Sequence, residues 1–117
     1  MSGRIEVICG SMFSGKTEEL INRIKNSGKS YKVFKPETDT RNKKNKIESH
    51  NKLKIEATTI KNITDILKVK TKYEIIGIDE AQFFSDKIIE VCNLLANQGI
   101  RVIIAVSYTH LRAHETS

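Results

Sequence analysis

The chain alternates short apolar runs with longer stretches in which apolar residues recur every three or four positions. Short, continuous apolar runs are typical of buried parallel strands, and the longer spacing is typical of helices packed on a sheet. This pattern predicts strands at 4–9, 31–35, 53–59, 73–78 and 100–106. It predicts helices at 16–27 and 85–97, with a short helix after Asn62. Strands that alternate with helices favour a parallel α/β sheet.

Each long helix has a predicted buried stripe and a glycine after its last turn. Gly28 and Gly99 are suited to end the two helices, because glycine readily adopts the left-handed backbone found there. The only proline, Pro36, ends the second strand. The polar stretch 37–52 is long for a connection, which indicates a functional loop. The predicted helix stripes are Leu20, Ile21 and Ile24, and Ile88, Ile89, Cys92 and Leu95.

Residues 10–17 read Gly-Ser-Met-Phe-Ser-Gly-Lys-Thr and fit the phosphate-binding P-loop G-x-x-x-x-G-K-[ST], between a predicted strand and a predicted helix. Backbone N–H groups of such a turn form a concave anion site, and Gly10 and Gly15 let the backbone approach phosphate. Lys16 is expected on the β- and γ-phosphates, and the Thr17 hydroxyl on Mg²⁺. The four free positions are Ser11, Met12, Phe13 and Ser14, of which Met12 and Phe13 either pack in the core or contact a base.

A second motif follows the apolar residues 75–78, where Asp79 and Glu80 come directly after the strand. The carboxyl ends of parallel strands are where ligands gather in open α/β sheets. Asp79 is therefore expected to hold Mg²⁺, and Glu80 to orient a nucleophile. Together with the P-loop, this acidic pair predicts a site for one magnesium–triphosphate.

Composition narrows the class of protein without identifying it. The 117 residues suffice for one domain, with 38% hydrophobic and 29% charged residues. We expect a cytoplasmic protein, because no run has the length of a membrane span and no secretory signal is visible. The net charge of +6 comes from scattered lysines with few aromatic residues, which argues against nucleic-acid binding. Cys9 and Cys92 fit no metal spacing and are expected to be buried thiols.

The two motifs together resemble the type II thymidine kinase family. The resemblance lies in residues 10–17, in Asp-Glu-Ala-Gln-Phe-Phe at 79–84, and in a segment similar to K-P-x-x-D-x-R … S-H that runs from Lys35 to Arg41 and on to Ser49-His50. It covers residues 1–106 and implies a P-loop NTPase-like (RecA-like) parallel sheet flanked by helices.

The resemblance implies a transfer of the ATP γ-phosphoryl group to the 5′-hydroxyl of thymidine or deoxyuridine, in nucleotide salvage. It implies that residues 10–17 bind ATP, that Glu80 accepts the hydroxyl proton, and that Asp39 and Arg41 lie near the phosphates and Mg²⁺. Arg41 would then help neutralise the transferring group. It also places Asp79, Glu80, Ala81 and Gln82 at the nucleotide and metal. The alternative for Asp39 and Arg41, which their family position disfavours, is a surface loop pair. His50 has no assigned role, and Phe83 and Phe84 are expected to pack.

The chain departs from the family after Val106. Residues 107–117 match no family segment and resemble a translated cloning or sequencing-adapter scar, so we expect a truncated domain at 1–106 followed by an unrelated tail. The family's four-cysteine zinc module and its lasso loop over the base are missing, since no cysteine follows Cys92. Zn²⁺, the homotetramer and inhibition by thymidine triphosphate are thus expected only in a full-length form. We expect this chain alone to be unstable and to phosphorylate little or no thymidine.

Two other interpretations remain open. Asp79-Glu80-Ala81-Gln82 is superficially similar to a helicase box, so the chain could be a fragment of another P-loop ATPase. It could also be an ATP-binding module without catalysis. ATP titration and RNA-stimulated hydrolysis separate these alternatives.

Overall fold

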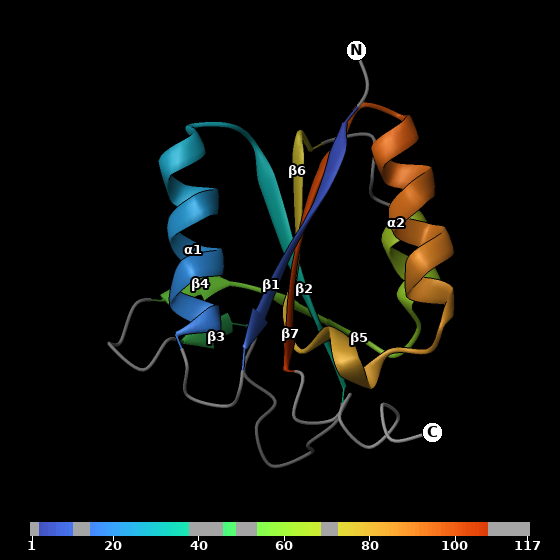
Figure 1. Cartoon of the computed structure of the whole chain (residues 1–117), viewed down its shortest axis with the longest axis horizontal. Coiled ribbons are helices and arrows are strands. Elements are labelled where there is room, and N and C mark those ends of the chain that lie inside the picture. The colour runs from blue at the N-terminus through green and yellow to red at the C-terminus, as the bar shows by residue number, and fades with distance from the viewer. Residues whose placement is uncertain (1–2, 11–14, 38–45, 49–53, 69–72, 108–117) are drawn as a thin grey trace.

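The computed structural model describes residues 3–10, 15–37, 46–48, 54–68 and 73–107. Within them the chain forms a five-stranded parallel sheet of order β1-β7-β6-β2-β5, with one long helix on each face (Figure 1). The predicted parallel α/β sheet is therefore confirmed. A two-stranded antiparallel ribbon, β3-β4, lies on the side of the first helix.

The bounds of the elements are as follows. The sheet consists of β1 (Arg4–Gly10), β2 (Tyr31–Pro36), β5 (Thr58–Ile60), β6 (Ile75–Ile78) and β7 (Arg101–Ser107). The ribbon consists of β3 (Lys46–Glu48) and β4 (Lys54–Glu56). The helices are α1 (Lys16–Ser27) and α2 (Lys87–Asn97), with short 3-10 helices η1 (Ile63–Lys68) and η3 (Ala81–Phe83).

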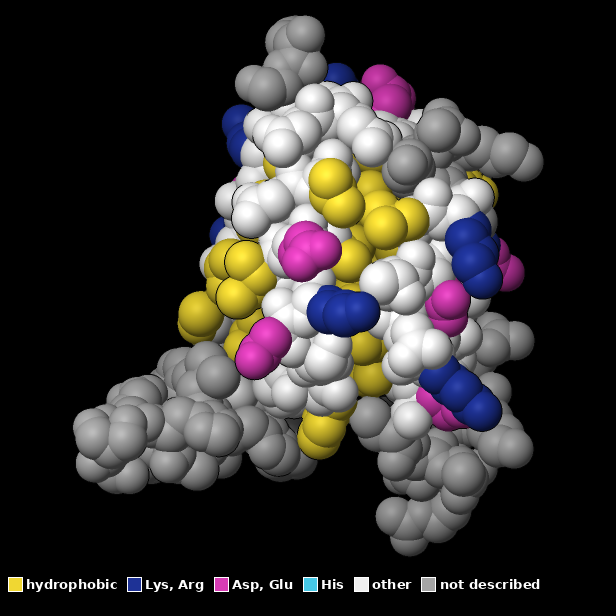
Figure 2. All heavy atoms as spheres, turned by 90° about the vertical axis from the view of Figure 1, so that its right-hand side faces the viewer, with side chains coloured by type: hydrophobic (Ala, Val, Ile, Leu, Met, Phe, Trp, Pro, Cys, Tyr) yellow, Lys and Arg dark blue, Asp and Glu magenta, His cyan; other side chains and the backbone are white. Residues whose placement is uncertain are grey.

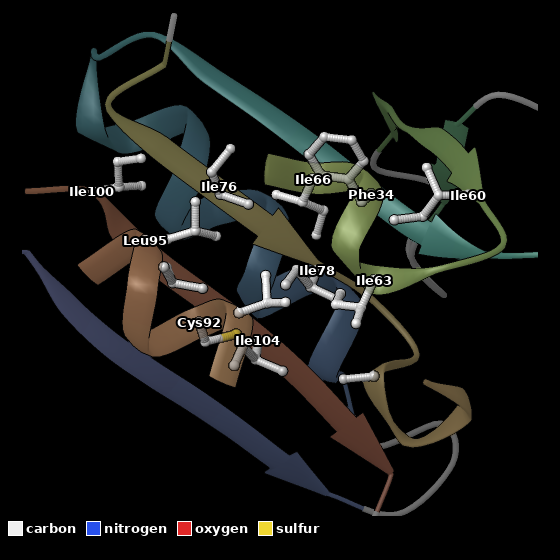
Figure 3. Packing of buried hydrophobic residues seen from close by; sticks show 13 residues of the cluster. Phe34, Ile60, Ile63, Ile66, Ile76, Ile78, Cys92, Leu95, Ile100 and Ile104 are labelled. Carbon is white, nitrogen blue, oxygen red and sulfur yellow. The ribbon is translucent and has the colours of Figure 1, made fainter. Parts of the chain in front are cut away.

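The sheet buries both of its faces, because successive side chains of a strand point to opposite sides. On the α2 side, strand residues such as Ile76 and Ile78 pack against α2 and η1 (Figure 3). On the α1 side, Ile75 and Ile103 pack against the helix. Gly77 lets α1 pack closely on this second side, since a Cβ there would lie 2.6 Å from the end of the Ile24 side chain and would force that side chain to shift.

The long helices follow the predicted spacing. All three predicted α1 residues are buried, and Gly28 and Gly99 have the left-handed backbone that ends a helix, with φ of 69° and 91°. The α2 helix begins at Lys87 rather than at residue 85, and the prediction for Ile89 is wrong, because its side chain is 67% exposed. Val91 is buried in α2 together with Cys92 and Leu95, so the buried stripe is rotated away from Ile89.

Two predictions in the middle of the chain need correction. The single strand expected at 53–59 is wrong, since β4 and β5 belong to different sheets and are separated by Ala57. Ala57 is buried against α1, and the chain there crosses from the ribbon to the edge of the main sheet. The polar stretch 37–52 contains β3, and its positions 38–45 and 49–52 lie outside the described residues.

The first strand is not buried on both faces as its apolar sequence predicted. Among the described strands β1 lies at the edge of the sheet, and Ile5 and Val7 are 38% and 54% exposed on the α2 side. These side chains and α2 border a groove of about 610 Å³, and apolar side chains gather on this face of the molecule (Figure 2). Cys9 is exposed, contrary to prediction, whereas Cys92 is buried and burial raises its pKa to about 11.

Candidate nucleotide-binding site

The P-loop motif lies where the sequence placed it, between a strand and a helix. The strand β1 ends at the buried Gly10, and α1 begins at Lys16. Gly15 precedes the helix with φ of 90°, a conformation that side chains disfavour, and its carbonyl accepts the N–H of Glu19 at 3.0 Å. The first turn of α1 therefore presents its N-terminal end at the carboxyl edge of the sheet, as an anion site requires. Residues 11–14 lie outside the described residues.

Asp79 reaches the same edge from a different strand. It follows β6, and its N–H donates to the carbonyl of Phe34 on the neighbouring strand at 2.9 Å. Its side chain points to the start of α1, where the Thr17 hydroxyl donates to Oδ2 at 3.5 Å. The second carboxylate oxygen, Oδ1, accepts the N–H of Glu80 at 3.0 Å. The helix start of the first motif and the carboxylate of the second motif thus meet, although β7 separates β1 from β6.

The surroundings of Asp79 disfavour its negative charge. The residue is only 5% exposed, and this burial, with the adjacent charge of Glu80, raises the pKa of Asp79 to about 6. The hydrogen bonds from Glu80 N–H and Thr17, together with the positive charge of Lys16, act in the opposite direction. A cation bound between Asp79 and a polyphosphate would compensate the same charge. The carboxylate and hydroxyl oxygens gathered here are the hard ligands that Mg²⁺ prefers.

Glu80 and Gln82 form the next turn of the site. Glu80 has φ of 52°, and it is the only residue other than glycine with a positive φ in the described part of the chain. Its Oε1 accepts a hydrogen bond of 2.6 Å from the side-chain amide of Gln82. The amide oxygen of Gln82 accepts the backbone N–H of Ser107 at 3.0 Å. The sequence placed Gln82 in this region, but nothing in the motif indicated its contact with the end of β7.

The remaining predicted residues are distributed as follows. Ala81 is buried in η3, Phe84 packs against the core, and Phe83 is about half exposed rather than packed inside. Asp39, Arg41 and His50 lie outside the described residues. Within the described residues, no cluster of three or more His, Cys, Asp or Glu side chains could hold a metal ion. None of the helices in that part of the chain is long and apolar enough to cross a membrane.

A second cluster of charges, which the sequence reasoning did not single out, lies in the amino-terminal half of β1. Glu6 accepts hydrogen bonds from Arg101 at 2.7 and 3.0 Å, from Arg4 at 2.6 Å and from Arg23 at 3.0 Å. Its side chain is only 17% exposed. We call Glu6 with these three arginines the Glu6 cluster. Arg4 lies two positions before Glu6 on β1, but the other two arginines come from α1 and β7, so no local sequence pattern indicated the whole cluster.

Comparison with known proteins gives a consistent result. The family model described as thymidine kinase matches residues 3–114. The chain is 52% identical over 106 residues to a protein named thymidine kinase from Bacteroides fragilis, and 53% identical to one from Bacteroides thetaiotaomicron. Each match covers 88% of this chain and 53% of the relative. A thymidine kinase from Porphyromonas gingivalis is 46% identical, with 52% of its length covered. The chain thus spans about half the length of the curated relatives it matches.

Proposed function

The chain belongs to the thymidine kinase family, and from this premise we propose that it forms the ATP-binding part of a thymidine kinase. The reaction is the transfer of the γ-phosphoryl group of ATP to the 5′-hydroxyl of thymidine or deoxyuridine. We propose this reaction for the complete kinase, by which we mean a polypeptide of the relatives' full length that contains residues 3–107. The observation that carries the proposal is the 3.5 Å contact between Thr17 and Asp79, which joins the two motifs at one edge of the sheet.

In this proposal the start of α1 binds the phosphates of ATP. The backbone N–H groups from Gly10 to Thr17 surround the phosphate oxygens, and the Lys16 ammonium group neutralises their charge. Thr17 and Asp79 fit a magnesium ion, because they offer oxygen ligands next to the place where the phosphates would lie. A bound Mg²⁺ would supply positive charge to the transferring phosphoryl group.

Glu80 acts on the acceptor in this proposal. Its carboxylate holds the 5′-hydroxyl in line with the γ-phosphorus and accepts the hydroxyl proton late in the transfer. A new bond forms between the 5′-oxygen and the γ-phosphorus, while the bond from that phosphorus to the β–γ bridging oxygen breaks and leaves ADP. The resemblance adds Asp39 and Arg41 near the phosphates. It also adds a zinc module and a cytoplasmic homotetramer for the complete kinase.

The first test concerns the P-loop itself. Lys16→Ala should weaken the binding of a fluorescent ATP analogue about 100-fold, because the loss of one partner from a buried charge pair costs roughly 2–5 kcal/mol. Lys29→Ala is the matched control, since Lys29 is exposed beyond the end of α1. Equal affinity of Lys16→Ala and the parent would refute the P-loop assignment.

The second readout is the reaction of the complete kinase with radiolabelled thymidine. ATP-dependent formation of thymidine 5′-monophosphate supports the proposal. ATP binding without any nucleoside product would instead indicate a non-catalytic module, and ATP hydrolysis stimulated by RNA would indicate a helicase-type ATPase.

A further inference from the structure

The side-chain amide of Gln82 stands between two groups of opposite hydrogen-bonding character. Its nitrogen donates to Glu80 Oε1 at 2.6 Å, and its oxygen accepts the backbone N–H of residue 107 at 3.0 Å. Only one orientation of the amide satisfies both partners, because a carboxylate needs a donor and a backbone N–H needs an acceptor. Gln82 is therefore fixed at both ends of its amide, and the short bond to a charged group is the stronger of the two.

The contact with residue 107 connects this amide to the P-loop strand. Residue 107 is the last residue of β7, and it pairs with Gly10 at the end of β1. Because the donor is a backbone N–H, the contact does not depend on the side chain at position 107. Gly10 is thus connected to the Glu80 carboxylate in three steps: by strand pairing to the end of β7, and from there by two hydrogen bonds through the Gln82 amide.

Glu80 needs such support more than most surface carboxylates. Its backbone lies in the left-handed region, at the start of a three-residue 3-10 helix, and its side chain is only partly buried. A glutamate side chain has several rotamers of similar energy unless contacts select one of them. Phosphoryl transfer depends mainly on positioning. A carboxylate that populates several rotamers would therefore contribute much less to catalysis.

We propose that Gln82 is a positioning residue for Glu80. Through its contact with the end of β7, Gln82 fixes the Glu80 carboxylate relative to the P-loop. This inference rests on the proposed function and deepens it, because it assigns Gln82 to the acceptor half of the reaction rather than to nucleotide binding. Gln82→Ala should therefore lower the kcat of the complete kinase while leaving the KM for ATP unchanged. The expected loss in kcat is about 10- to 100-fold, as for a misplaced catalytic group. Gln98→Ala, on the exposed end of α2, is the matched control.

A double-mutant cycle separates positioning from a general structural effect. If Gln82 acts through Glu80, then Gln82→Ala should reduce kcat in the parent but cause no further loss in a Glu80→Gln background. Equal losses in both backgrounds would overturn the inference. The variant Gln82→Glu keeps an acceptor for the N–H of residue 107, but its ionised carboxylate cannot donate to Glu80 and repels it, so it should lose at least as much kcat as Gln82→Ala.

Hydrogen exchange of the complete kinase gives a readout that needs no activity. The N–H of residue 107 should exchange faster in Gln82→Ala, remain protected in Gln82→Glu, and be unchanged in Gln98→Ala. Unchanged protection in Gln82→Ala would show that the contact with β7 is absent and would overturn the inference while the proposed function stands. A parent kinase that binds ATP and phosphorylates no nucleoside would instead refute the proposed function, and the role of Gln82 with it.

Discussion

Glu6 and Asp79 are both mostly buried carboxylates in the described part of the chain, and their surroundings differ in a way that separates stability from function. Glu6 is held by three arginines, and the hydrogen bonds from Arg101, followed by those from Arg4, hold its pKa at about 2. Asp79 is more deeply buried, has a long hydrogen bond from Thr17, and has a pKa raised to about 6. One carboxylate is satisfied by the protein itself, whereas the other is placed where its charge is costly. Such a cost is expected of a group that awaits a ligand.

The position of each site in the sheet agrees with this difference. The Glu6 cluster joins β1, β7 and α1 in the amino-terminal half of the strands, so it stabilises the elements on which the P-loop is built. The turn at residues 79–82, which we call the acidic turn, lies at the carboxyl edge, where ligands of parallel sheets bind. The comparison therefore predicts that substitutions in the acidic turn affect catalysis and ligand binding more than stability. Substitutions in the Glu6 cluster should affect stability more than catalysis and ligand binding.

The largest effect is expected for Glu80→Gln in the complete kinase. The amide keeps the size of the side chain but cannot accept the 5′-hydroxyl proton, so kcat should fall roughly 1,000-fold, within the range for removal of a general base. ATP affinity should stay within a factor of about two, because the substitution removes no group that the proposal places on the phosphates. Steady-state assays with radiolabelled thymidine and a separate ATP titration measure the two quantities.

Glu90→Gln is the matched control for that experiment, because Glu90 is exposed on α2. If the kcat of Glu80→Gln were close to that of the control, Glu80 would have no role in the transfer reaction. The proposed difference between a catalytic acidic turn and a stabilising Glu6 cluster would then fail.

The next effect is a loss of stability in Glu6→Gln. Hydrogen bonds to charged groups contribute about 1.5–3 kcal/mol each, and the neutral amide cannot accept from all three arginines. We expect the complete kinase to lose about 2 kcal/mol, which lowers Tm by roughly 4–8 °C at this size. ATP affinity should not change. Glu19→Gln is the matched control, since Glu19 is half exposed and has Arg23 as its ion-pair partner among the described residues, so its loss should stay below about 0.5 kcal/mol.

The same cluster predicts how stability depends on pH. The folded pKa of Glu6, about 2, is below the ordinary value of 4.5. The unfolded chain therefore binds a proton first as the pH falls, and the stabilisation by Glu6 is complete above pH 4.5 and is lost between pH 4.5 and 2. Thermal unfolding of the parent and of Glu6→Gln should converge over this range. A constant difference between them would show that the ion pairs do not set the contribution of Glu6.

The sequence predicted the acidic turn better than the Glu6 cluster, for a physical reason. The P-loop, α1 and Asp79 are specified by local patterns, because a glycine-rich turn, a helical stripe and a strand end each involve neighbouring residues. Of the partners of Glu6, Arg4 is on β1 itself, but Arg23 and Arg101 are 17 and 95 positions away on α1 and β7, and no periodicity of β1 encodes them. The same limit explains Gln82, whose second contact is with a strand that comes 25 positions later.

The fold predictions failed where they depended on the order of the strands. An apolar run such as 4–9 has the same sequence character at the centre of a sheet and at its edge, so the exposure of Val7 could not be predicted. Likewise, the alternation across 53–59 is continuous in the sequence, but Ala57 marks a change from one sheet to another. Strand order and sheet membership depend on contacts between distant segments, which a single-sequence pattern does not record.

The smallest effect, and the one that tests the comparison most directly, is expected for Asp79→Asn. The amide oxygen can still accept the N–H of Glu80, and the amide nitrogen can donate to the Thr17 hydroxyl, so both contacts can be kept. The substitution removes a buried charge that lies beside Glu80. Without nucleotide and magnesium, the complete kinase should therefore be more stable by about 1 kcal/mol, whereas Glu6→Gln is destabilised.

The gain in stability should be accompanied by a loss of ligand binding. The Mg²⁺ concentration needed for half-maximal binding of ATP should rise about 10-fold in Asp79→Asn, because the proposed site loses its only carboxylate among the described ligands. Asp86→Asn, exposed before α2, should change neither quantity by a comparable amount. If Asp79→Asn lost stability as Glu6→Gln does, Asp79 would be a structural carboxylate, and the distinction between the two regions would fail. Higher stability of Asp79→Asn together with weaker magnesium-dependent binding of ATP would instead show that the Asp79 charge lowers the stability of the fold and is needed to bind the ligand.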